Sequence, residues 1–315
     1  MVAAKVFIDG EAGTTGLQIR ERLAGRRDIE LLSIPDARRK DTNARAELLN
    51  SADIAILCLP DEAARQSVDL IKNTTTRVID ASSAFRVAKD WAYGFAEMSK
   101  TQAMAIAKAK RVSNPGCYPQ GPIALLRPLV AAGLVPAGFG ASVNAISGYS
   151  GGGRKMIENY QGMGESAPVF QPYALDFVHK HVPEMTLYCG LDKAPLFTPA
   201  VGRYYQGMLG ALPLQMGEWE KIPSGKELHT ALGDYYSLIK DGFVELADFV
   251  PGQKQAHLDP ESLNGTNKMR LYVFANDDQA QALLVAVYDN LGKGAAGAAV
   301  QNLNLMIGAN AKTSL

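Results

Sequence analysis

The residues with the clearest chemical potential surround Cys117. The segment from Ser113 to Gly121 reads SNPGCYPQG and precedes an apolar, helix-like run from Ile123 to Ala132. This order predicts that Cys117 lies at a helix start, where unpaired amides and the positive end of the helix dipole favour thiolate over thiol. Because the thiolate is the nucleophilic form of cysteine, the pattern indicates covalent catalysis at Cys117.

The other two cysteines are predicted to be packing residues. Cys58 lies inside an apolar strand-like run, and Cys189 is interpreted in the same way. An odd count of three cysteines does not form a disulfide framework in a chain of 315 residues. This cysteine usage favours a reducing cytoplasm as the location of the protein.

Covalent chemistry on a carbonyl also needs a proton donor and base. His179 and His181 are two positions apart, so in a strand both side chains would face the same way. We predict His181 as the general acid/base, with His179 as the second candidate. Such a pair can also bind a metal ion, but no third Cys, His or carboxylate stands at a convincing ligand spacing. We therefore predict no metal site.

Arginines are the expected ligands of an acidic substrate, because the planar guanidinium suits both phosphate and carboxylate. The candidates are Arg86, Arg154 and Arg203, each of which could equally form a structural salt bridge. Arg154 ends a glycine-rich loop that begins with Ser147 and Gly148, and the amides of this loop are suited to bind an oxyanion.

A second chemical signal is the glycine turn after the first apolar run. Gly10, Gly13 and Gly16 follow Asp9 at intervals of three, between a predicted strand and a predicted amphipathic helix. A dinucleotide pyrophosphate needs close backbone approach and free amides at a helix N-terminus, which glycine permits. Hydroxyl donors can come from two neighbours, Thr14 and Thr15. The spacing departs from G-x-G-x-x-G, so a plain tight turn is the alternative.

The choice between NAD and NADP depends on the end of the second predicted strand. Asp36 stands 20 residues after Gly16, where an acid would hold the ribose hydroxyls of NAD. Arg38, Arg39 and Lys40 follow, and these cations favour the 2′-phosphate of NADP. NADP is our prediction, with a solvated basic loop as the alternative.

The composition excludes several classes of function. Lys plus Arg and Asp plus Glu both number 32, which removes the overall field expected of a nucleic-acid-binding protein. No apolar stretch approaches the roughly 18 residues of a membrane span. With 47% hydrophobic and 20% charged residues, the chain has the composition of a globular protein. We expect a small-molecule substrate, no nucleic acid and no membrane.

The elements that must position these residues follow two patterns. Over the first 115 residues apolar runs alternate with helical segments, which predicts βαβ units and a doubly wound parallel sheet. The predicted strands are Val6–Ile8, Leu31–Ile34, Ile54–Leu59 and Arg77–Ile79, and the predicted helices are Thr15–Leu23, Ala44–Leu49 and Glu62–Ile71. From about Gly138 the runs are longer, which predicts an α+β domain with a largely antiparallel sheet. The stretch from Gly294 to Gly308 predicts a final helix that packs back on the first domain.

Taken in order, these motifs resemble the N-acetyl-γ-glutamyl-phosphate reductases of arginine biosynthesis, in their shorter form, along the whole chain. The motifs are the Gly10–Gly16 turn, DASSAFR from Asp80, NPGCY from Asn114, SGYSGGGR from Ser147, HKHVPE from His179 and DNLGKGAAGAAVQN from Asp289. Two positions depart from the family pattern. Gln120 stands where many members have Thr, and Ala84 replaces a common Asp. Neither position is the nucleophile.

The resemblance implies a Rossmann-type domain (residues 1–116 and 291–315) and a catalytic and dimerisation domain (residues 117–290) in a homodimer or homotetramer. It implies NADPH-dependent reduction of N-acetyl-γ-glutamyl phosphate to N-acetylglutamate 5-semialdehyde, with release of phosphate, through a thioester on Cys117. Further cofactor ligands are predicted at Ser82, Ser83, Asn114, Asn290, Lys293 and Gly294.

Two alternatives remain at this point. Aspartate-semialdehyde dehydrogenases share the fold and the thioester chemistry, although the HKHVPE and SGYSGGGR segments favour the glutamyl-phosphate family. A nicotinamide-sensing or scaffold protein without catalysis is the second. The presence of both Cys117 and the histidine pair argues against that alternative.

Overall fold

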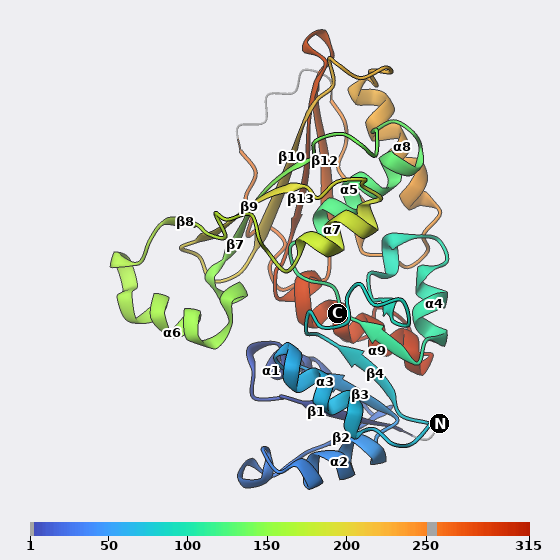
Figure 1. Ribbon diagram of the computed structural model, residues 1–315, viewed down its shortest axis with the longest axis vertical. Helices are drawn as coiled ribbons and strands as arrows, with labels where there is room; N and C mark the ends of the chain where they lie inside the picture. The colour runs from blue at the N-terminus through green and yellow to red at the C-terminus, as the bar shows by residue number, and fades with distance from the viewer. Residues whose placement is uncertain (1–2, 251–256) are drawn as a thin grey trace. The chain divides into compact units, whose positions relative to one another are not determined.

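The computed structural model describes residues 3–250 and 257–315, and the chain divides into two compact units (Figure 1). Unit 1 contains Met1–Ala96, Thr101–Pro115 and Ala295–Leu315, and unit 2 contains Glu97–Lys100 and Gly116–Gly294. The end of the chain therefore returns to the unit that its beginning forms. The short segment Glu97–Lys100 belongs to unit 2 although its neighbours on both sides belong to unit 1.

Unit 1 is built on a six-stranded sheet in the order β2-β1-β3-β4-β6-β5, with every pairing parallel. The strands are β1 (Ala4–Asp9), β2 (Ile29–Leu32), β3 (Ile54–Leu57), β4 (Arg77–Asp80), β5 (Ala92–Tyr93) and β6 (Arg111–Ser113). The predicted doubly wound parallel sheet is confirmed. The second strand begins and ends two residues earlier than predicted, since Ile29 rather than Leu31 pairs with the start of β1.

Helices cover this sheet. They are α1 (Thr14–Leu23), α2 (Thr42–Ser51), α3 (Asp61–Leu70), α4 (Gln102–Lys108) and α9 (Gly297–Ile307), with a 3-10 turn at Asp36–Arg38. The final helix α9 packs on unit 1 as predicted, since Val300 and Leu303 share a buried cluster with Val6 and Ile8 of β1. The turns that precede α1 and α3 follow the carboxyl ends of β1 and β3.

Unit 2 is built on a seven-stranded mixed sheet in the order β11-β12-β13-β10-β7-β9-β8. The strands are β7 (Ser142–Gly148), β8 (Phe170–Pro172), β9 (Leu196–Gly202), β10 (Met208–Gln215), β11 (Val244–Leu246), β12 (Met269–Asn276) and β13 (Gln281–Tyr288). Four pairings are antiparallel, whereas β7 with β9 and β11 with β12 are parallel. The predicted largely antiparallel sheet is therefore confirmed, with two parallel pairs that were not predicted.

One face of this second sheet is covered by helices. The helices of unit 2 are α5 (Gln120–Ala131), α6 (Gly153–Met163), α7 (Val182–Cys189) and α8 (Gly225–Ser237). Helices α5 and α8 pack on β10, β12 and β13. Alternate side chains such as Leu212 and Leu284 are buried on that side. On the opposite face, Val285 and Val287 of β13 are buried in a cluster with Leu263, which lies in the loop before β12.

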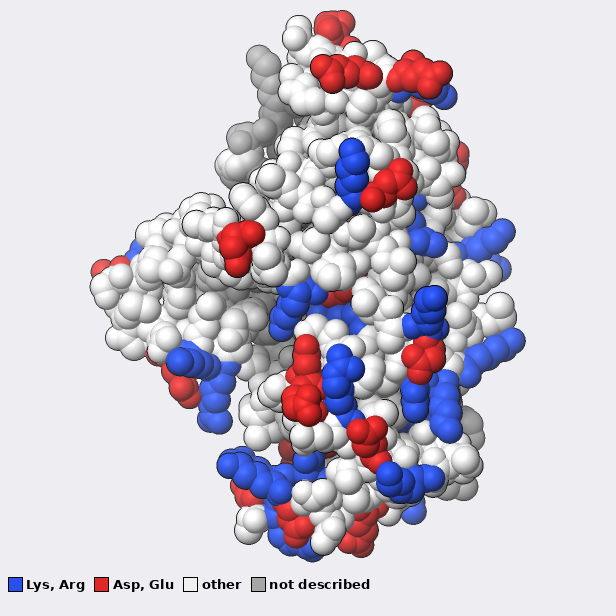
Figure 2. Space-filling model, viewed as in Figure 1, with Lys and Arg blue, Asp and Glu red and all other residues white. Residues whose placement is uncertain are grey.

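Charged side chains of both signs are interspersed over the visible surface (Figure 2). In the described part of the chain, no helix combines the length and the apolar character needed to span a bilayer.

Candidate functional site

The glycine turn joins β1 to α1 and has a geometry that only glycine permits. Gly10 has φ of +91°, and a Cβ there would lie 2.4 Å from the carbonyl oxygen of Cys58. A Cβ on Gly16 would lie 2.6 Å from the carbonyl oxygen of Gly10. The amide of Gly13 donates to that same carbonyl at 3.0 Å. The turn thus has no Cβ at Gly10, Gly13 and Gly16, which suits the close approach of a pyrophosphate to the backbone at these positions.

A pocket of about 420 Å³ opens beside this turn in unit 1. Its charged lining residues include Asp36, Arg39 and Lys40. Arg45 also lines it, but the Arg45 guanidinium is held by the buried Asp9 carboxylate at 2.9 Å. A glycine-rich turn beside two lining cations suits a dinucleotide, although the carboxylate-bearing residues Asp9 and Glu11 line the pocket as well. Thr14 and Thr15 begin α1 next to the pocket-lining Gly13.

Arg38 does not have the position that we predicted for it. Its guanidinium pairs with Asp41 at 3.2 Å, and the residue is absent from the pocket lining. Arg38 ends the 3-10 turn Asp36–Arg38, which places Arg39 and Lys40 at the pocket instead. Two of the three predicted cations, Arg39 and Lys40, therefore line the pocket.

Ser82 and Ser83 form hydrogen bonds with carboxylates of unit 1. The Ser82 hydroxyl donates to Asp80 at 2.7 Å, and the Ser83 hydroxyl donates to Asp61 at 2.8 Å. Burial raises the pKa of Asp80 to about 6, while the Ser82 hydrogen bond opposes that rise. Both serines therefore shape the turn after β4. Their predicted contact with the cofactor stays a prediction.

Arg86 and Asn114 take part in a buried network in unit 1. The Arg86 guanidinium donates to the backbone carbonyls of Asn114 and Ala81, both at 3.1 Å. The Asn114 side chain donates to the carbonyl of Ala295 and accepts from Asn302 of α9, again at 3.1 Å. Arg86 was predicted to bind substrate. These contacts instead favour a structural role for Arg86, which holds the backbone of Asn114 in the segment that leads to Cys117.

Cys117 lies in the turn that precedes α5. Because α5 begins only at Gln120, the cysteine precedes the first helical residue rather than occupying the helix start that we predicted. The Tyr288 hydroxyl donates to the Cys117 carbonyl at 2.7 Å. The Gly116 amide donates to the buried carboxylate of Glu184 at 3.0 Å. A Cβ on Gly294 would lie 3.2 Å from the Cys117 Cβ, so Gly294 packs directly against the nucleophile.

The two histidines lie in a turn and not in a strand, so strand alternation does not explain their proximity. His181 immediately precedes α7, and its amide donates to Nδ1 of His179 at 3.1 Å. The two rings lie 4.7 Å apart between centroids. The two rings are close because this hydrogen bond folds the turn back on itself.

Tyr118 connects the nucleophile turn with the histidines. Its ring centroid lies 5.9 Å from that of His181 and 6.2 Å from that of His179. Its hydroxyl donates to the carbonyl of Ala200 in β9 at 3.0 Å. The residue that follows the cysteine therefore brings the predicted nucleophile and the predicted acid/base pair into one neighbourhood of unit 2.

Cys58 and Cys189 lie in surroundings that disfavour their thiolates. Burial raises the pKa of Cys58 to about 12, with further contributions from Asp80 and Asp9. Burial also raises the pKa of Cys189, which lies in the core of unit 2. Both groups are free thiols in the structure. These surroundings suit packing residues and not nucleophiles.

The predicted substrate-binding residues in and after β7 lie in unit 2. The Ser147 hydroxyl donates to the Gly148 carbonyl at 3.2 Å, and Gly148 tolerates no Cβ because Tyr205 and Gln206 approach its backbone. Arg154, near the start of α6, is exposed and pairs with Glu158 at 3.2 Å. Arg203 donates to the carbonyls of Glu165 and Ala167. Arg154 thus forms the salt bridge that was its alternative, whereas the contacts of Arg203 are hydrogen bonds to backbone carbonyls.

Two predicted cofactor residues have buried structural partners in unit 2. The Asn290 side chain accepts from the Gly207 amide at 2.7 Å and donates to Ser150 at 3.0 Å. The Lys293 ammonium is fully buried and pairs with Glu97 at 2.6 Å. Burial lowers the pKa of Lys293, whereas the Glu97 carboxylate opposes that change. These contacts argue against a direct cofactor contact for either side chain.

Sequence reasoning missed three residues that hold this site: Tyr118, Glu184 and Tyr288. Glu184 was quoted only as the last letter of HKHVPE, yet a buried carboxylate usually has a specific partner. The partner is the amide next to the nucleophile. Tyr288 stands in an apolar run and gave no signal, because its hydroxyl reaches a carbonyl 171 positions away.

Family comparisons agree with the two-unit division. Residues 33–106 match a semialdehyde dehydrogenase NAD-binding domain, and residues 117–290 match a semialdehyde dehydrogenase dimerisation domain. Among curated relatives, the N-acetyl-gamma-glutamyl-phosphate reductase of Chelativorans sp. (strain BNC1) is 64% identical, over 97% of this chain and 99% of the relative. The protein of the same name from Burkholderia lata is 53% identical, over 96% of each chain.

Solved structures show the same fold at low identity. Aspartate semialdehyde dehydrogenase II of Vibrio cholerae, complexed with ASA, aligns with a TM-score of 0.71 at 17% identity, over 98% of this chain and 99% of that one. Aspartate semialdehyde dehydrogenase of Candida albicans, solved with NADP, aligns with a TM-score of 0.67 at 14% identity, over 99% of this chain and 100% of that one. At such identities the likeness concerns the fold alone.

Proposed function

This chain belongs to the N-acetyl-gamma-glutamyl-phosphate reductases, and on that premise we propose that Cys117, His181 and the pocket at the glycine turn carry out the reaction of the family. The enzyme is an NADP-dependent reductase of arginine biosynthesis. Its substrate is N-acetyl-γ-glutamyl phosphate, and its products are N-acetylglutamate 5-semialdehyde and phosphate.

Cys117 performs the covalent step. Its thiolate sulfur forms a bond to the acyl carbon, and the phosphate departs with the electron pair of the broken C–O bond. NADPH, when bound, supplies the hydride that reduces the resulting thioester. His181 protonates the oxygen of the hemithioacetal and takes the proton back as the C–S bond breaks, which releases the aldehyde and restores the thiolate. His179 positions the substrate or the His181 ring.

The single observation that carries this proposal is the neighbourhood around Tyr118. Tyr118 directly follows Cys117, a part-exposed thiol in the turn before α5, and its ring lies near the rings of His179 and His181. The pocket geometry supports NADP, because Arg39 and Lys40 line it and Gly10 and Gly16 leave its turn open. A scaffold protein without catalysis would need none of these groups.

The test is the reverse reaction with purified protein. Phosphate-dependent reduction of NADP is measured with N-acetylglutamate semialdehyde, glutamate semialdehyde and aspartate semialdehyde. We expect the acetylated substrate to give the highest kcat/KM. A higher kcat/KM with aspartate semialdehyde would reject the assigned substrate, and the absence of NADP reduction with all three would reject the enzyme.

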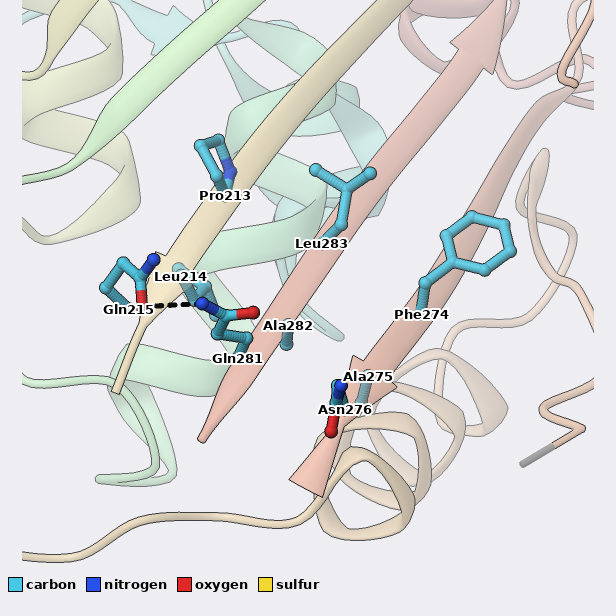
Figure 3. A pocket seen from close by; sticks show the side chains of 9 residues that line it. All are labelled: Pro213, Leu214, Gln215, Phe274, Ala275, Asn276, Gln281, Ala282 and Leu283. Carbon is cyan, nitrogen blue, oxygen red and sulfur yellow. Dashed lines mark hydrogen bonds between the residues drawn. The ribbon is translucent and has the colours of Figure 1, made fainter. Parts of the chain in front are cut away.

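The oligomer forms through unit 2, whose matching domain is described as a dimerisation domain. On the face of the seven-stranded sheet opposite α5 and α8, which we call the open face, Pro213, Leu283 and Phe274 project from β10, β13 and β12 around a hollow of about 350 Å³ (Figure 3). The polar side chains at the strand ends beside this hollow are Gln215, Asn276 and Gln281. We propose a homodimer in which two such faces pack together, since a sheet of this kind buries its apolar side against another layer. A reducing cytoplasm is the proposed location, in keeping with the free thiols.

A further inference from the structure

An unusual number of apolar side chains are exposed in one short segment of unit 2. We call residues 169–178, which contain β8 and the loop after it, the apolar strap. Its large apolar residues and their exposed fractions are Val169 66%, Phe170 59%, Leu175 67%, Phe177 55% and Val178 79%. On the face shown in Figure 2, the surface over α6 and β8 is largely uncharged, with charged side chains at its rim. Contiguous exposure of this kind marks a surface that another molecule covers.

The backbone of the strap is also strained. Ala174 has φ of 50° and Phe177 has φ of 61°, in the left-handed region that residues with a Cβ rarely adopt. Such residues persist when their surroundings hold them in place. In the single chain, Phe177 is more than half exposed, so its own unit holds it only in part.

The strap continues the open face of the sheet. β8 is the edge strand of that sheet, and it pairs only with β9 among the strands described. Phe170 and Pro172 line a hollow of about 290 Å³ together with Ile146, Leu209 and Ala211 from the open face. A second copy that covers this face therefore meets the strap as well. The domain described as a dimerisation domain, residues 117–290, includes the whole strap.

The strap leads directly into the histidine turn. Val178 is followed by His179, and the ring of Tyr173, within the strap, lies 5.8 Å from the ring of His179. We propose that a second copy of this chain covers the apolar strap and thereby holds His179 and His181 in their working positions. The proposal rests on the homodimer and the histidine roles proposed above. It makes the acid/base site of each copy complete only in the dimer.

The experiment compares the double variant Leu175→Ser, Val178→Ser with the matched control Leu238→Ser. Leu238 follows α8 in unit 2 and is 64% exposed, close to the 67% of Leu175. Sedimentation velocity over a dilution series gives the dimer dissociation constant. We expect it to rise about 100-fold in the strap variant, because the two changes each occur twice in a two-fold interface and each of the four lost apolar side chains contributes roughly threefold. The control should stay within about twofold of the wild type.

Two further readouts follow the histidines. NMR of histidine-labelled protein resolves few signals, because the chain has four histidines. In the wild type, the signals of His179 and His181 should change when dilution dissociates the dimer. In the strap variant, the same change should occur at a higher protein concentration. Turnover should fall as the dimer dissociates and recover as the dimer re-forms. Since sedimentation and NMR need no substrate, they remain decisive if the assigned reaction is wrong.

Three outcomes would overturn the proposal. An unchanged dissociation constant in the strap variant would mean that the strap faces another protein or the chain's own substrate. Histidine signals that are identical in monomer and dimer would remove the link to the site. Turnover that is lost in the strap variant and stays lost after the dimer has re-formed at high concentration would assign the strap to substrate binding. The milder pair Leu175→Ala, Val178→Ala provides the same readouts should the serine variant fold poorly.

Discussion

The glycine turn in unit 1 and the cysteine turn in unit 2 both precede a helix, but they are held in different ways. The glycine turn closes through a bond between Gly10 and Gly13, and Gly16 packs on its own turn. The cysteine turn is held by Glu184 and Tyr288, whose partners lie 68 and 171 positions away. A turn that binds a cofactor through its backbone can be specified locally. A turn that positions a nucleophile here depends on side chains from the rest of its unit.

The variant with the largest expected effect should impair the function of the cysteine turn and leave that of the glycine turn intact. Cys117→Ser should lower kcat by at least about 10⁴-fold, because a serine hydroxyl is a far weaker nucleophile than a thiolate. The dissociation constant for NADPH should stay within about twofold, since the pocket lining of unit 1 does not include this residue. Cofactor fluorescence titration and single-turnover kinetics provide the two values. Cys58→Ala and Cys189→Ala are the controls, and near-normal turnover in Cys117→Ser would reject the thioester.

Removal of the acid/base should have the next largest effect. His181→Asn should lower kcat by about 10² to 10⁴-fold, as is typical for a general acid/base, and His179→Asn by less. An imidazole titrates near neutral pH, so the pH dependence of kcat should change in the His181 variant. The measurement is kcat from pH 5 to pH 9, which extends about 1.5 units below and about 2.5 units above the ordinary histidine pKa of about 6.5. An unaltered profile would transfer the role to another group.

Glu184, which holds the cysteine turn, allows a sharper test of the difference between the two turns. Glu184→Ala should lower kcat by about 10- to 100-fold, because a small displacement of a reacting group has an effect of that order. The KM values should change much less. Glu184→Gln keeps an oxygen that can accept from the Gly116 amide at the observed 3.0 Å, and it should recover most of the loss. Equal losses in both variants would show that the carboxylate charge matters rather than its hydrogen bond.

The same contrast explains which predictions from the sequence succeeded. The alternation of strands and helices and the glycine turn follow from local periodicity and local sterics, and the structure has both. The spacing of two between the histidines did not decide between a strand and a turn, and the structure has a turn closed by the His181 amide. The buried pairing of Lys293 with Glu97 could not be predicted, since the two residues are 196 positions apart, and the cofactor contact of Lys293 stays a prediction. Residues that meet only in the tertiary structure produce no recognisable spacing in the sequence.

The smallest expected effect concerns the cations at the glycine-turn pocket. Arg39 and Lys40 line it, whereas Arg38 pairs with Asp41 outside the lining, so the three neighbours form a natural set of variants. Arg39→Ala and Lys40→Ala should each raise the KM for NADP roughly 10-fold, because each removes one charge-assisted contact with the 2′-phosphate.

The KM for NAD should change little in either variant, since NAD lacks that phosphate. Arg38→Ala is the matched control and should leave both values within about twofold, as expected for an exposed ion pair. Steady-state kinetics with each cofactor, at fixed ionic strength because surface charges are screened, provide the comparison. A larger effect from Arg38 than from its two neighbours would mean that the 3-10 turn Asp36–Arg38 rearranges when the cofactor binds. The glycine-turn region would then depend on more than its local backbone.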